Sequence, residues 1–389
     1  MKETYRSLAN TLERSMAQCN GMNVSVEDSF GSSLFPENSN EARTKGKLNQ
    51  IFFNDKVDVI LALYNLAMNR KVDTGRAVVE FVLFQSFMEQ ENYEQAQKCL
   101  AAFESELYGL HLEDTTAEEV EQESGVIAMQ VYFLLSHEAA HVIFSNNERS
   151  KQAELRQTRY LMHDLKTEME DLRARYDVKD IVNDPRVQRH IWAVVPESLS
   201  AAEKEMIHER LSRMMQHSPY TPAFVGEMAD GNNMAYLEEI SADRVAWLTL
   251  LNVLRQMDAT NEDILQMNMS FLVSLAAMEF NKVLQSHYIP SLYGKYEYDG
   301  LKVHLRQQIF KTLLRQYTPD VDKLYKHQYS DMIGGLERIL QTVNSSIEDK
   351  IPELKILYSN AGKDAIPVFA TRNRLNAAMD NVLSEYLHL

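Results

Sequence analysis

Glycine, proline and cysteine are all scarce in this 389-residue chain, which contains 13, 9 and 2 of them respectively. Because glycine and proline interrupt helices, their scarcity, together with 19 methionines, favours a mainly helical fold. The two cysteines, Cys19 and Cys99, form no CxxC pair and have no metal-ligand spacing. This argues against a cysteine-based zinc module and favours a reducing, intracellular compartment.

The chain also lacks an excess of positive charge and a long hydrophobic run. Its 40 basic and 56 acidic residues give a net charge of −16, and such a surface repels phosphate backbones, so we expect no nucleic-acid partner. The N-terminus has no basic region followed by an apolar one, and the most apolar stretch, 126–135, is interrupted by Gln130. That stretch is too short to cross a bilayer, so we predict a cytoplasmic protein without a membrane span.

What the chain has instead is helical periodicity over most of its length. Helices are predicted at 1–20, 56–69, 76–90, 93–107, 115–145, 148–178, 199–216, 234–257, 260–285, 301–316, 330–347 and 370–387. The segments between them that are rich in turn residues are interpreted as loops at 21–48 (with room for a short strand), 218–233 and 288–300, while 190–195 reads as a strand or a buried loop.

The segment HEAAH at 137–141 has the pattern of a zinc-binding helix. His137 and His141 are four positions apart, so on a helix their side chains project from one face, one turn apart. That separation suits two adjacent vertices of a tetrahedral zinc ion. Glu138, beside the first histidine, is placed to take a proton from a water molecule at the open position.

The residues around this segment are apolar on almost every side, which predicts a buried helix. Two histidines and a glutamate within a buried helix are costly unless something satisfies their polar atoms. A bound metal would do so. The alternative interpretation is a pair of core histidines satisfied by hydrogen bonds alone.

A second apolar helix, predicted at 234–257, offers the remaining ligand. Glu239 and Asp243 are again four positions apart. Glu239 can complete a site of two histidines and one glutamate, and Asp243 can accept the outer N–H of a ligand imidazole. Glu238 is a competing ligand, but Ala242 stands four residues after it, so Glu238 lacks such a partner. Without the first motif, this spacing would usually mean a solvated helix face.

Together, HEAAH at 137–141 and EISAD at 239–243 resemble the HExxH plus ExxAD pair of gluzincin metallopeptidases. The chain is also similar to the Lit-type phage-exclusion peptidases. The resemblance covers only the two motif helices, and the gap between them is long for the group. It implies zinc as the cofactor, His137, His141 and Glu239 as its ligands, Glu138 as the base and Asp243 as the partner of a ligand.

With this resemblance, the expected fold class is mainly α: a zincin-like metallopeptidase core, with room for a small β-sheet, elaborated by long helices. We expect an N-terminal helical region over 1–110 and a C-terminal helical region over 317–389. The catalytic core is expected over 111–316, with a helical insertion at about 148–230. This insertion is interpreted either as a lid or substrate-docking arm or as a decorative addition.

A peptidase of this kind also needs a group that stabilises the oxyanion formed on the attacked carbonyl. Members of this group often supply it after the helix of the third ligand. His287-Tyr288 and His304-Leu305-Arg306 are the candidates, and we select His304 as the catalytic residue. The alternative interpretation, and the more usual one for each of these residues, is a surface or packing residue.

The function predicted from these motifs is that of a zinc-dependent endopeptidase. It would hydrolyse a specific protein or peptide substrate with Glu138 as general base, in a defence, toxin-like or regulatory role. One alternative is a helical protein-interaction module with a structural or inactive metal site. Another is a peptidase whose cleft is blocked until a regulatory protein partner binds.

Overall fold

The computed structural model confirms that the protein is mainly helical, with a small sheet. It describes residues 3–28, 41–45, 48–53, 57–70, 72–110, 112, 116–175, 222–230, 234–288, 293–324 and 369–387, and single positions within 200–209 and 342–350.

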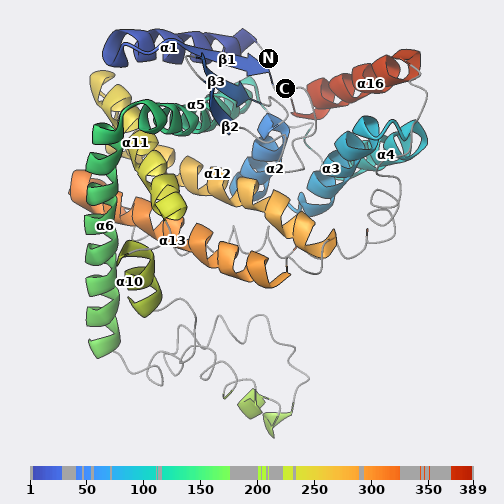
Figure 1. Ribbon diagram of the computed structural model, residues 1–389. Helices are drawn as coiled ribbons and strands as arrows, with labels where there is room; N and C mark the ends of the chain where they lie inside the picture. Colours follow the sequence, from blue (N-terminus) through green and yellow to red (C-terminus); the bar gives the residue numbers. More distant parts are fainter. Residues whose placement is uncertain are drawn as a thin grey trace. The chain divides into compact units, whose positions relative to one another are not determined.

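The helices follow the predicted periodicity closely, and Figure 1 shows them. Their bounds are α1 Glu3–Asn20, α2 Val57–Arg70, α3 Gly75–Glu89, α4 Tyr93–Gly109, α5 Ala117–Asn146, α6 Glu148–Arg175, α10 Pro222–Asp230, α11 Met234–Gln256, α12 Asn261–Tyr288, α13 Tyr293–Tyr317 and α16 Phe369–Leu387. Most of the predicted helix ends lie within three residues of these bounds.

The segment 21–48, predicted as a loop with room for one short strand, holds more strand than that. β1 (Val24–Asp28), β2 (Glu41–Lys45) and β3 (Leu48–Phe53) form a sheet in the order β1-β3-β2. β1 runs parallel to β3, and β2 runs antiparallel to it. Alternate side chains of β1 and β3 are buried, but each strand is only five or six residues long. So short an alternation is a weak signal in the sequence, and pairing with a distant segment completes it.

Two further loop predictions are wrong. The segment 218–233 contains α10, which Pro222 begins, as proline suits a first helical turn. Phe224 and Met228, one turn apart, are buried, and a contact of 3.2 Å between His163 Nε2 and Asp230 Oδ1 joins α10 to α6. In the segment 288–300, α13 already begins at Tyr293. Tertiary burial therefore favours helix at α10, where turn-forming residues had suggested a loop.

Some predictions fall outside the described residues. The predicted strand or buried loop at 190–195 does so entirely. The helices predicted at 199–216 and 330–347 do so for most of their length.

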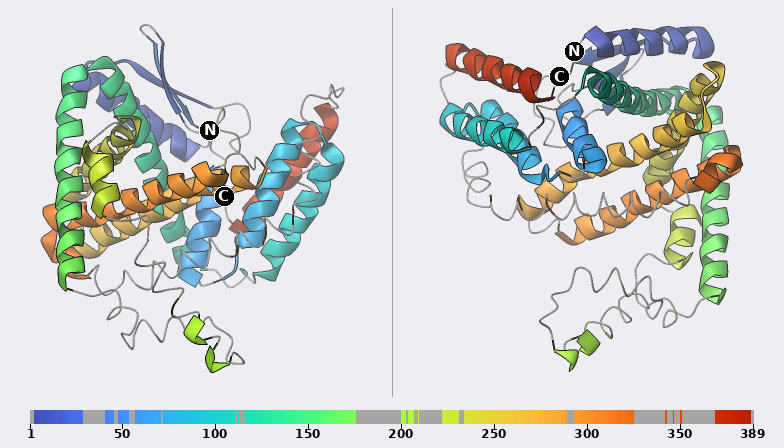
Figure 2. Two further views of the ribbon diagram at one scale, coloured as in Figure 1. Left: turned by 60° about the horizontal axis from the view of Figure 1, so that its bottom comes forward. Right: turned by 180° about the vertical axis from the view of Figure 1, so that it is seen from behind.

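The chain divides into two compact units, one of Met1–Lys151 with Ala242–Leu389 and the other of Gln152–Ser241. In the first unit, α5 packs against α1, α2, α12 and the strands β2 and β3. α12 and α13 also pack against each other, and Figure 2 shows them running side by side. α5 is thus the central helix of this unit. By length and composition alone it could cross a membrane, and 72% of its most apolar window is buried inside the protein.

A buried polar network anchors α5 at Gln130. The side-chain amides of Gln130 and Asn65 of α2 exchange hydrogen bonds of 2.9 and 3.1 Å. Gln130 Nε2 also donates to the backbone oxygen of Ser270 in α12 (3.2 Å). Because each buried amide needs matched partners, this network favours one register among the three helices.

In the second unit, α6 packs beside the N-terminal part of α11. The hydroxyl groups of Thr158 and Ser241 are buried and lie 2.8 Å apart. The boundary between the units, after Ser241, falls inside α11, which continues unbroken from Met234 to Gln256.

Candidate metal centre

The helix that presents both histidines, α5, begins with a capping box. Thr116 accepts a hydrogen bond from the backbone N–H of Glu119, and the Glu119 carboxylate accepts one from the backbone N–H of Thr116. This pairing satisfies two of the N–H groups that a helix start leaves open. About six turns further on, α5 carries His137, which is 4% exposed, and the half-buried His141.

The two imidazoles face each other through their Nε2 atoms, which lie 3.2 Å apart. Two nitrogen ligands of one tetrahedral zinc ion, each about 2.0–2.1 Å from the metal, would be about 3.3 Å apart. The observed spacing therefore matches two ligands on one ion. Two nitrogen lone pairs facing each other repel, so this arrangement needs a proton or a metal ion between them.

The outer nitrogen of His137 is held by Asp243 of α11. His137 Nδ1 lies 2.9 Å from Asp243 Oδ1. Because an ionised carboxylate can only accept hydrogen bonds, Nδ1 carries the proton, and in the neutral ring Nε2 then presents its lone pair towards His141. This is the tautomer that a metal ligand needs. The structure thus brings Asp243 to the imidazole of His137, one of the two histidines considered for this contact.

Asp243 is itself buried, with 1% of its surface exposed, and Arg306 of α13 compensates its charge. Arg306 Nε donates to Oδ2 (2.6 Å) and Nη2 donates to Oδ1 (2.7 Å). Burial alone would raise the pKa of Asp243, but the charge and hydrogen bonds of Arg306, with the hydrogen bond of His137, lower it below the ordinary value. The carboxylate therefore stays ionised in the core.

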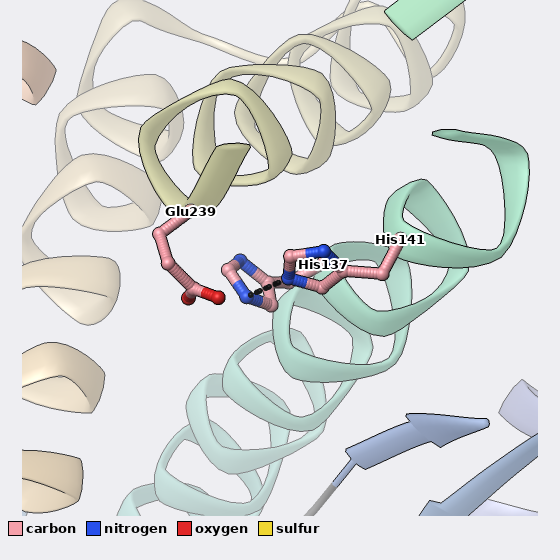
Figure 3. Close-up of side chains that lie close together, drawn as sticks. All are labelled: His137, His141 and Glu239. Carbon is pink, nitrogen blue, oxygen red and sulfur yellow. Dashed lines mark hydrogen bonds between the residues drawn. The ribbon is translucent and has the colours of Figure 1, made fainter. Parts of the chain in front are cut away.

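Glu239 precedes Asp243 by one turn of the same helix, so α11 places its carboxylate beside the imidazoles. One donor atom from each of His137, His141 and Glu239 lies within 4.8 Å of the others. Figure 3 shows the Glu239 carboxylate directed towards the two rings. Among the described residues, this is the group of three donors that could hold a metal ion, and the competing Glu238 is not part of it.

An apolar cluster supports the site from the N-terminal side of His137. Phe133, one turn before it, stacks on Phe271 of α12 with ring centres 4.2 Å apart, and contacts Phe310 of α13 edge-on. On the other side, Ala140 and Phe144 of α5 pack against Ala242 of α11. Close-packed neighbours restrict the rotation of the helices that carry the ligands.

The remaining residues predicted for the site are Glu138 and the candidates for stabilising the oxyanion. Glu138 follows His137 in α5 and is 8% exposed, and it is not one of the three grouped donors. His304 lies in α13, but its side chain is outside the described part of the structure, as is that of His287. Arg306, named as a candidate for the oxyanion, is bound to Asp243. The sequence signal for this pairing is weak, since no spacing rule links 243 to 306.

Comparison of the chain with protein-family models, with curated proteins and with solved structures yields no match. The chemistry of this centre therefore rests on the geometry of its own residues.

Proposed function

We propose that this protein is a zinc-dependent endopeptidase of the gluzincin type, with a zincin-like core around α5 and α11. The observation that carries the proposal is the group of His137, His141 and Glu239, whose donor atoms lie within 4.8 Å of one another. Glu138 directly follows His137 in α5. Two imidazoles and one carboxylate are the protein ligands of many catalytic zinc sites. The protein substrate and the defence, toxin-like or regulatory role belong to the same proposal.

In this proposal the metal ligands, Glu138 and Asp243 have separate roles in hydrolysis. A zinc ion held by the three donors would polarise the scissile carbonyl and make the attacking water more acidic. Glu138 takes the proton from that water and passes it to the nitrogen of the departing amine. Asp243 keeps the Nε2 lone pair of His137 available to the metal, because it accepts the proton of Nδ1.

Partial exposure of the donors favours a catalytic over a structural metal. His141 and Glu239 are only half-buried, so solvent reaches their side of the group. A structural zinc site has four protein ligands and is closed, whereas a catalytic one keeps a position open. Two histidines and one carboxylate can also hold iron(II). The adjacent Glu138 favours hydrolysis, for which zinc is suited.

The test compares the wild type with Glu138→Gln, which keeps the shape of the side chain and removes its basicity. Elemental analysis of both purified proteins should find about one zinc per chain. Newly formed protein N-termini, compared between cells that produce each protein, should occur with the wild type only. General-base catalysis contributes about 10²–10⁴-fold, so the variant should be slower by that factor. Equal cleavage by the variant, or iron in place of zinc, would contradict the proposal.

A further inference from the structure

Arg306 is bound to Asp243 by two hydrogen bonds, and its role reaches beyond balancing a charge. Nε donates a hydrogen bond to Oδ2 (2.6 Å), and Nη2 donates one to Oδ1 (2.7 Å). A fork of this kind fixes the plane of a carboxylate, which a single contact would leave free to turn. Oδ1, which accepts from Arg306, is also the atom that accepts from His137 Nδ1. The guanidinium therefore sets the direction in which Asp243 holds the ligand ring.

The helix of Arg306 is itself held in register with α5. Phe310 follows Arg306 by one turn of α13, and Phe133 precedes His137 by one turn of α5. The rings of Phe310 and Phe133 are 5.8 Å apart and meet edge-on. α13 thus meets this face of α5 at two levels, one apolar and one polar through Asp243. The contact between Phe310 and Phe133 sets the position along α5 at which Arg306 meets Asp243.

We propose that Arg306 is a positioning residue of the metal centre: through Asp243 it orients His137 and thereby sets the affinity for the metal. This inference rests on the proposed zinc site but not on peptidase activity. Arg306 needs no contact with metal or substrate. Its guanidinium orders the carboxylate, the carboxylate orders the imidazole, and the imidazole presents Nε2 at the donor position.

The experiment measures the zinc dissociation constant of the full chain by competition with a chromogenic chelator. Arg306→Met removes both the positive charge and the two-point hydrogen bonding of the guanidinium. Arg306→Lys keeps the charge but contacts the carboxylate through a single nitrogen. We expect zinc affinity to fall at least about tenfold in Arg306→Met, the lower end for loss of an outer-shell partner. Arg306→Lys should recover only part of this loss, since the fork is absent.

Arg244→Met is the matched control, because Arg244 is a similarly buried arginine (7% exposed against 9%) that donates to the Tyr317 hydroxyl at 3.1 Å. This control should lose stability but keep its zinc affinity within about twofold, because the hydrogen bond that it removes is to Tyr317 and not to Asp243. A second measurement needs no metal. It records ¹⁵N nuclear magnetic resonance spectra of the protein with labelled histidines, and the variant His137→Gln identifies the signals of His137. The wild type should show His137 protonated at Nδ1, and Arg306→Met should show a mixture of tautomers.

The outcomes separate the inference from the proposed function. Zinc binding by the wild type with unchanged affinity and tautomer in both Arg306 variants overturns the inference alone. A wild type that binds no zinc overturns both. If Arg306→Met does not fold, Arg306→Lys decides, since wild-type affinity in that variant would show that the fork has no role.

Discussion

Replacing Asp243 by asparagine perturbs the centre with almost no change in shape. Asp243 accepts three hydrogen bonds, two from Arg306 and one from His137. Asparagine offers one oxygen and one NH₂ group. If the oxygen takes the place of Oδ1, the NH₂ meets Arg306 Nε; if it takes the place of Oδ2, the NH₂ meets both Nη2 and His137. A donor faces a donor in either orientation.

The expected cost follows from the burial of the pair. Asp243 is 1% and Arg306 9% exposed, so the variant would remove from the core the carboxylate charge to which the guanidinium donates two hydrogen bonds. Removing one partner of a buried ion pair costs about 3–5 kcal/mol. A domain is stable by only about 5–15 kcal/mol, so Asp243→Asn should remove a large part of the unfolding free energy.

Urea unfolding of the metal-free protein measures this cost without any contribution from zinc. Arg306→Met should also destabilise the protein, whereas the double variant lacks both charges and should lose less than the two single losses together. The coupling between contacting residues is typically about 0.5–3 kcal/mol. If Asp243→Asn unfolds within about 0.5 kcal/mol of the wild type, or if the losses simply add, the reasoning about this buried pair is wrong.

Three further predictions concern the ligands, the aromatic cluster and a helix start. His141→Ala should lose bound zinc while its circular dichroism stays unchanged, and zinc retention by elemental analysis would contradict the ligand assignment. Phe133→Ala should cost about 3–5 kcal/mol in urea unfolding, because its ring is fully buried against Phe271; a loss below about 1 kcal/mol would contradict that packing. Hydrogen bonds from Thr260 lower the pKa of Asp263, so this carboxylate stabilises the fold above its unfolded pKa, about 3.9. The melting temperature of Asp263→Asn should therefore lie below that of the wild type at pH 7, and the difference should shrink as the pH falls below about 4. A difference independent of pH would contradict a stabilising role for the Asp263 carboxylate at the start of α12.

The helical fold and the pairing of His137 with His141 are determined by local sequence. Helix periodicity depends on neighbours within a turn or two, so the bounds of α5 and α11 could be read from the chain. The same spacing rule places Glu239 one turn before Asp243. The strands β1, β2 and β3 were harder to predict, because their pairing depends on segments distant in the chain.

Which of these polar residues come into contact depends on how the helices pack. Spacing alone left Glu238 as a competing ligand and left Arg306 as one of several candidates for stabilising the oxyanion. The packing of α5 and α11 brings Glu239 to the histidines, and the packing of α13 brings Arg306 to Asp243. A buried carboxylate must find a donor wherever the helices place one, and no pattern within a single helix encodes that choice.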